Sequence, residues 1–113
     1  MRWLLRSKIH SATVIEANVN YVGSITIDED LIDRTGLWPG EKVLVVDNTN
    51  GARIETYVMV GERHSGIICM NGAAAHLIKE GDQIIIMGFE LSDETIEPQI
   101  ITVDETNKFV RYI

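Results

Sequence analysis

The sequence contains a single cysteine, Cys69, which excludes an intrachain disulfide. This usage is typical of a reducing compartment, and we expect a cytoplasmic protein. Long apolar runs are also missing: the longest, such as Ile84 to Phe89, fall far short of the ~20 residues of a membrane-spanning helix. The stretch from Trp3 to Leu5 is cut off by Arg6, before the roughly 7–15 residues of a signal-peptide core. We therefore expect no membrane partner.

Basic residues are scarce as well. The chain has 10 Lys and Arg against 17 Asp and Glu, which gives a net charge of −7 at pH 7. Because this charge repels a phosphate backbone, we expect no nucleic-acid partner. Low-complexity segments and linkers are absent, and a length of 113 residues with ordinary globular composition suits one domain over residues 1–113.

The chain does contain many short windows rich in β-branched residues. Several of them alternate apolar and polar side chains, as a half-buried strand does. The predicted strands are Thr13 to Val19, Ser24 to Ile27, Lys42 to Val46, Arg53 to Val60, Ile67 to Met70, Gln83 to Phe89 and Gln99 to Val103. Polar residues gather after Ser92, where we expect a peripheral strand or arm.

Two short helices are predicted between these windows. The first begins at the carboxylates Asp28 to Asp30, which favour a helix N-terminus, and ends at Gly36. The second covers Ala73 to Lys79 and ends at Gly81 in the same manner. Both are too short to be stable alone, so tertiary packing must hold them.

A short motif recurs after both predicted helices. Gly40-Glu41 and Gly81-Asp82 each precede a strand window, and the two glycines are 41 positions apart. The repeated helix–turn–strand unit indicates a pseudo-symmetric barrel of interlocked halves. Between two strand windows, Asn48 to Gly51 ends in Asn-Gly, which predicts a hairpin turn.

The candidate reactive element is the dipeptide Gly23-Ser24. A serine hydroxyl can attack the preceding carbonyl carbon, because the two atoms close a five-membered ring. Glycine on the acyl side has no Cβ to crowd the tetrahedral intermediate. The attack also requires a fold that orients the peptide. Without such a context, Gly-Ser is simply a turn that enters a strand.

Four segments supply a context for this dipeptide: Lys8 to His10, Ala17 to Asp28, Asn50 to Tyr57 and Asn71 to Ala75. In order and spacing they resemble the pyruvoyl-dependent aspartate decarboxylase family, from Lys8 to about Phe89. The resemblance implies a mainly β fold, a double-psi β-barrel with two or more short helices, which agrees with the repeated unit. It also implies conversion of L-aspartate to β-alanine and CO2, which supplies pantothenate synthesis, by a homotetramer with sites between subunits.

The resemblance further implies that the chain cleaves itself between Gly23 and Ser24. The products would be a β chain, residues 1–23, and an α chain, residues 24–113, whose Ser24 has become a pyruvoyl group. This covalent cofactor would form a Schiff base with the substrate and accept electrons, as pyridoxal phosphate does elsewhere, so no pyridoxal phosphate is needed. Whether a maturation partner protein triggers the cleavage stays open.

Other positions take roles from the same resemblance. Tyr57 would donate the proton to Cα after CO2 leaves, while Thr56 would hydrogen-bond the Gly23 carbonyl and contact the substrate. Arg53 offers a planar fork for a carboxylate. The substrate-binding set is Thr56, Gly72, Ala73, Ala74, Arg53 and Lys8, and the supporting set is His10, Tyr21 and Asn71.

The sequence bears on three other interpretations. A non-catalytic barrel module that binds protein or DNA stays open as the alternative, since such barrels also serve as regulators, although the negative charge disfavours DNA. No metal is expected, because His10, His64, His76 and Cys69 lack paired ligand spacing. No G-x-S-x-G elbow is present, which disfavours a serine hydrolase.

Overall fold

The computed structural model describes all residues, Met1–Ile113. In chain order the elements are β1 (Arg2–Thr13), β2 (Glu16–Asn18), β3 (Ser24–Asp28), α1 (Glu29–Thr35), β4 (Lys42–Asp47), β5 (Arg53–Gly61), β6 (Ile68–Asn71), the 3-10 helix η1 (Gly72–His76), β7 (Gln83–Ser92), β8 (Gln99–Val103) and β9 (Phe109–Tyr112). Neither helical segment has the length or apolar character that a bilayer crossing requires.

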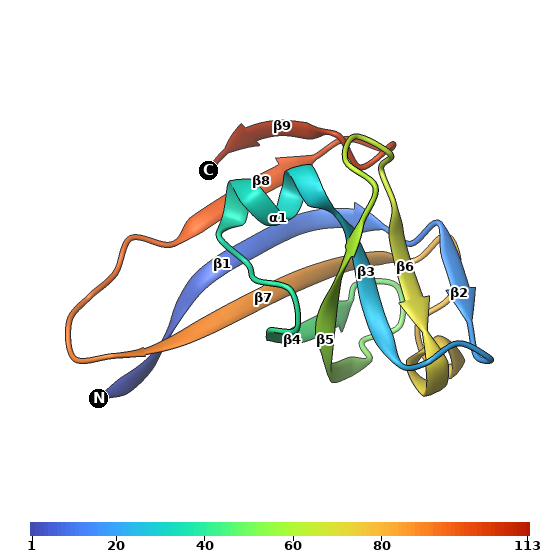
Figure 1. Cartoon of the computed structure of the whole chain (residues 1–113), viewed down its shortest axis with the longest axis horizontal. Coiled ribbons are helices and arrows are strands. Elements are labelled where there is room, and N and C mark those ends of the chain that lie inside the picture. Colours follow the sequence, from blue (N-terminus) through green and yellow to red (C-terminus); the bar gives the residue numbers. More distant parts are fainter.

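The strands form one sheet that closes on itself. Their order is β2-β6-β3-β5-β4-β7-β1-β8-β9, and only Val14 and Ile15 separate β1 from β2 along the chain. β2 and β1 therefore lie at the two ends of the series β2-β6-β3-β5-β4-β7-β1, yet they are consecutive pieces of one bent strand. Because they join these two ends, the series closes into a barrel (Figure 1). β8 and β9 extend the sheet beyond β1.

Two similar units interlock to make this barrel. The first consists of β1–β2, β3, α1 and β4, and the second consists of β5, β6, η1 and β7. Strand β3 pairs in parallel with β5 of the other unit, and β2 pairs in parallel with β6. The equivalent strands β3 and β6 pair antiparallel, as do β4 and β7. This exchange is the double-psi β-barrel, so the predicted mainly β fold class is confirmed.

The barrel interior is filled mostly by β-branched side chains at alternate strand positions. On β3, Ile25 and Ile27 are fully buried in a core of 18 residues, while Ser24 and Thr26 face the other side. Ile84 and Ile86 of β7 complete the opposite wall in the same way. The two-residue alternation seen in the sequence therefore places the hydroxyl side chains of β3 on its outer face, outside the apolar core.

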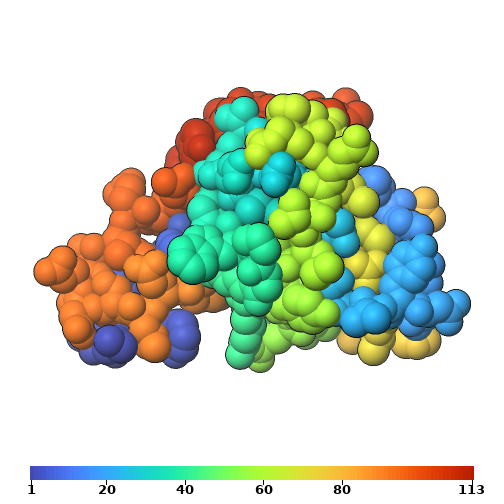
Figure 2. Space-filling model, viewed as in Figure 1, coloured from blue at the N-terminus to red at the C-terminus, as the bar shows by residue number.

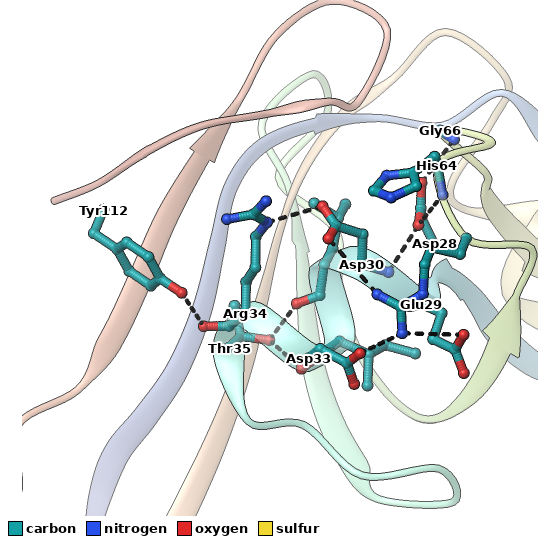
Figure 3. A network of polar contacts seen from close by, with 12 residues as sticks. Asp28, Glu29, Asp30, Asp33, Arg34, Thr35, His64, Gly66 and Tyr112 are labelled. Carbon is teal, nitrogen blue, oxygen red and sulfur yellow. Dashed lines mark hydrogen bonds and ion pairs between the residues drawn. The ribbon is translucent and has the colours of Figure 1, made fainter.

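The first predicted helix is confirmed with its caps. The Asp28 carboxylate accepts a hydrogen bond from the Asp30 amide at 2.9 Å, and Gly36 ends the helix with φ +75°. The same carboxylate accepts hydrogen bonds from the amides of His64 and Gly66 at 2.9 and 2.8 Å (Figure 3). One side chain thus joins the end of β3 and the start of α1 to the turn between β5 and β6.

The second predicted helix is shorter than expected and is not an α-helix. It is a 3-10 helix over Gly72–His76, after which the Asp82 carboxylate accepts a hydrogen bond from the Lys79 amide at 2.9 Å and turns the chain. Five residues are too few to establish an α-helix without further packing. Gly81 follows with φ +91°, in the left-handed region predicted for it.

The predicted hairpin turn is confirmed, and it packs beside the loop that follows η1. Gly51 has φ +79° between the antiparallel strands β4 and β5. The Asn50 side-chain amide donates to the Leu77 carbonyl at 2.8 Å. Below the turn, burial and the neighbouring Asp82 carboxylate raise the pKa of the fully buried Asp47.

The chain ends differ from the expectation in two ways. Strand β1 begins at Arg2, well before the predicted start at Thr13, and with β7 it forms a long ribbon that projects from the barrel (Figure 2). The segment after Ser92 was expected to be peripheral, and β9 is indeed exposed. Ile101 of β8, however, is fully buried, because β8 pairs with β1 and covers the core.

Candidate active site

Ser24 lies at the start of β3, on the face opposite the barrel interior. It is only 4% exposed, because β6 covers it from one side. Asn71, at the end of β6, is its direct cross-strand neighbour. The Asn71 amide donates hydrogen bonds to Ser24 Oγ at 2.9 Å and to Thr26 Oγ1 at 3.0 Å. The candidate nucleophile is therefore buried and held by a single amide group.

The peptide before Ser24 touches a second backbone. Gly72, directly after Asn71, has φ +76°, and a Cβ added to it would lie 2.6 Å from Gly23 Cα. The same Cβ would lie 3.1 Å from the Tyr21 carbonyl oxygen. Glycine is required at position 72 both for its backbone conformation and for this close approach. The two glycines thus place η1 against the Gly23–Ser24 junction.

Tyr57 reaches the same face from the other side of β3. Ile25 pairs with Val58 in the parallel β3–β5 ladder, so Tyr57 lies level with Ser24. Val58 points into the core, and Tyr57 therefore points outward, where it is 38% exposed. Thr56 pairs with the buried Val43, and the β4–β5 register is unbroken, so Thr56 and Tyr57 lie on opposite faces of β5.

The remaining predicted site residues are divided between near and distant positions. Ala73 and Ala74 lie in η1 next to Gly72, whereas Lys8 and His10 lie on β1, where they pair with β8 and Lys8 also pairs with β7. Arg53 lies four residues before Tyr57, about 13 Å along the strand. The single chain does not bring Lys8, His10 or Arg53 to Ser24.

Two further residues of the site were missed by the sequence analysis. Thr26 accepts from the Asn71 amide, and Cys69 Sγ lies 3.2 Å from Asn71 Oδ1 and 3.5 Å from Glu16 Oε2. Burial, followed by the nearby Glu16 carboxylate, raises the pKa of the Cys69 thiol to about 11, so the thiol is neutral. The sequence signal that could have found them is a spacing of two residues, since residues two apart lie on the same face of a strand. Thr26 follows Ser24 at this spacing, and Cys69 precedes Asn71 at the same spacing.

A cavity of about 560 Å³ lies beside β4, whose Lys42 is the cross-strand neighbour of Tyr57. It is lined by Trp3, Lys42, Val43, Leu44, Glu55 and Phe89. Trp3 is 68% exposed there, which leaves a large apolar side chain open to water. This cavity does not include Ser24, so the candidate active site is identified by its side chains and not by a deep pocket in one chain.

The chain is a small double-psi β-barrel whose outer face holds a buried serine that accepts a hydrogen bond from an asparagine. Comparison with known proteins identifies its family. A family model described as aspartate decarboxylase matches residues 1–110, and the chain belongs to the aspartate decarboxylase family.

Individual relatives agree with this assignment. The chain is 54% identical over 111 residues to the aspartate 1-decarboxylase of Bacillus subtilis, covering 95% of this chain and 87% of that protein. It is 56% identical over 111 residues to the aspartate 1-decarboxylase of Acetivibrio thermocellus, with coverage of 95% and 88%. Among solved structures, the computationally designed msDPBB_sym2 protein is 18% identical with a TM-score of 0.46, covering 76% of this chain and 98% of that one.

Proposed function

We propose that this chain cleaves itself between Gly23 and Ser24, and that the pyruvoyl group so formed decarboxylates L-aspartate to β-alanine and CO2. The observation that carries the proposal is the hydrogen bond from the Asn71 amide to Ser24 Oγ, beside the close approach of Gly72 to Gly23. In the cytoplasm the product would supply pantothenate synthesis. Family membership supports the substrate.

The cleavage follows from the atoms at this junction. Ser24 Oγ attacks the Gly23 carbonyl carbon, the C–N bond breaks, and an ester with a free Ser24 amine results. Loss of the Ser24 Cα proton then breaks the Cβ–Oγ bond, and the oxygen leaves with Gly23 as a carboxylate. Water replaces the nitrogen, which departs as ammonia. The Asn71 N–H group faces the oxygen that becomes negative, and it stabilises this charge as an oxyanion-hole donor does.

The residues around Ser24 fit a pyruvoyl group at this position. The Ser24 side chain is buried, and the Tyr57 strand position is level with it. When formed, the group supplies a carbonyl that takes up the substrate amine and accepts electrons from Cα. The chain's own contribution is Tyr57, whose phenol would donate a proton to Cα from the exposed face.

A second copy of the chain would complete the substrate site. Lys8 and Arg53 carry the positive charge and the bidentate fork that a dicarboxylate needs, yet they and His10 lie away from Ser24. The exposed Trp3 and the apolar cavity beside it support burial against a neighbouring copy. We therefore keep the homotetramer with sites between subunits as part of the proposal.

Intact mass spectrometry and a CO2 assay test the proposal on the purified chain. We expect two fragments, residues 1–23 and 24–113, whose summed mass equals the precursor plus water minus ammonia. The cleaved protein should release CO2 from L-aspartate. An uncut chain after long incubation would contradict unaided cleavage, and cleaved protein that releases no CO2 would contradict the decarboxylase activity.

Gly72→Ala should slow the cleavage at least about tenfold, because its Cβ would lie 2.6 Å from Gly23 Cα and must displace the junction. The measurement is the rate at which the uncut chain disappears. Gly51→Ala is the matched control, since Gly51 has φ +79° but no atom within 4 Å of an added Cβ. Both variants pay the same left-handed strain of about 1–2 kcal/mol, so equal cleavage rates would show that the contact with Gly23 is unimportant.

A further inference from the structure

We infer that Cys69 sets the orientation of the Asn71 amide and is a positioning residue for the cleavage at Ser24. The inference rests on the proposed self-cleavage. Cys69 Sγ lies 3.2 Å from Asn71 Oδ1, while the nitrogen of the same amide donates to Ser24 Oγ at 2.9 Å. Cys69 itself does not touch Ser24, so its effect passes through Asn71.

The hydroxyl groups of Ser24 and Thr26 do not determine which of the two possible orientations the Asn71 side-chain amide adopts. Ser24 and Thr26 can each donate or accept, and both would pair equally well with the amide nitrogen or the amide oxygen. The Cys69 thiol is the only hydrogen-bond partner of Asn71 Oδ1, and Asn71 is 7% exposed. Without this thiol, Oδ1 in the present orientation would be a buried acceptor with no partner, which is costly.

The thiol has one proton and three acceptors within reach, of which the Met70 carbonyl is the farthest at 4.0 Å. Burial raises the pKa of Cys69 to about 11, so this proton is present at neutral pH. Glu16 Oε2 is farther away than Asn71 Oδ1, at 3.5 Å, and Glu16 is exposed, so water can satisfy its carboxylate. Asn71 Oδ1 is nearer and buried. The proton therefore belongs on the Asn71 side, where it holds the amide oxygen away from Ser24.

This orientation matters when the Cβ–Oγ bond of Ser24 breaks. The departing oxygen gains negative charge as it becomes part of the Gly23 carboxylate, and an N–H group facing it stabilises the charge. A reversed Asn71 amide would place its oxygen against the departing oxygen and oppose the step. Cys69 therefore favours the cleavage-competent arrangement without supplying or removing a proton itself.

The test compares Cys69→Ser with Cys69→Ala in the full chain. Both remove the sulfur and leave a similar gap, but only serine keeps a donor for Asn71 Oδ1. We expect Cys69→Ala to cleave about tenfold more slowly than the parent chain, as for the loss of one hydrogen bond to a buried group. Cys69→Ser should remain within about threefold of the parent. Cleavage is followed by intact mass, and unfolding midpoints are measured in a Ser24→Ala background.

If Cys69 serves only to fill space, Cys69→Ser should cleave no faster than Cys69→Ala, because a buried serine packs no better than alanine. Serine equal to or slower than alanine would overturn the inference. Met70→Val, which loosens the same strand from its core face, should lower the unfolding midpoint and leave cleavage within about threefold. If Cys69→Ala does not fold, Cys69→Val replaces it as the near-isosteric variant without a donor.

The same experiment separates this inference from the proposed function. A parent chain that stays uncut contradicts the self-cleavage, and the Cys69 inference falls with it. A parent chain that cuts itself, together with a Cys69→Ala variant that cuts equally fast, contradicts the positioning role alone.

Discussion

The Ser24→Ala variant is expected to remain a single uncut chain of 113 residues and to release no detectable CO2 from L-aspartate. The substitution removes the one oxygen that can attack the Gly23 carbonyl and later leave with it, and alanine cannot be converted to a pyruvoyl group. Intact mass measures the first effect, and CO2 release measures the second. Both losses should be complete, since each depends on the same atom.

Ser7→Ala is the matched control for this experiment. Ser7 is a second buried serine, on β1 instead of β3, and its hydroxyl donates to the Thr35 carbonyl. Its loss should lower stability by about 1–3 kcal/mol, because the Thr35 carbonyl loses a partner, and it should leave the cleavage intact. Any cleavage between residues 23 and 24 in Ser24→Ala would refute the serine mechanism.

Tyr57→Phe is expected to cleave normally and yet to lower the decarboxylation rate by about 10²–10⁴-fold, the contribution typical of a general acid. The variant keeps the ring on the outer face of β5 and removes only the phenolic O–H, which the cleavage does not use. The rate is measured per cleaved chain, so that incomplete maturation does not mimic a catalytic defect.

Tyr112→Phe is the matched control, because it removes a phenolic oxygen at a position outside the candidate active site. The Tyr112 hydroxyl donates to the Arg34 carbonyl at 2.9 Å, on the network around α1 (Figure 3). This control should change stability by about 1 kcal/mol and leave the decarboxylation rate within about twofold. If Tyr57→Phe and Tyr112→Phe turn over at equal rates, Tyr57 is not the proton donor.

Local features of the fold were predictable because neighbouring residues determine them. The cap at Asp28, the end of α1 at Gly36 and the turn at Gly51 all follow from side chains or backbone angles within a few residues. The second helix exists but is shorter than predicted: it is a 3-10 helix over Gly72–His76, and Lys79 beyond it donates its amide to the Asp82 carboxylate. That outcome depends on packing beside the hairpin turn and not on helix propensity.

The site was predictable in its reactive residue and much less so in its surroundings. Gly23-Ser24 stands out by its own chemistry, and the family resemblance supplied Asn71 and Tyr57. The two-residue spacing of Cys69 and Asn71 places them on one strand face, but a lone cysteine in an apolar strand has no pattern that marks a functional role. The antiparallel pairing of β3 with β6 places Cys69 opposite Thr26 and Asn71 opposite Ser24.

By itself, then, the order of residues determined the strand windows from β3 to β8, the caps, the repeated glycine–acid turn and the bond that can break. Only the folded barrel decided that β6 pairs with β3, that Tyr57 lies level with Ser24, and that Lys8 lies apart from both. The physical reason is the range of the interactions. Caps and turns act within one helical turn, whereas strand pairing joins residues such as Ser24 and Asn71 that are 47 positions apart, and it depends on the packing of the whole core.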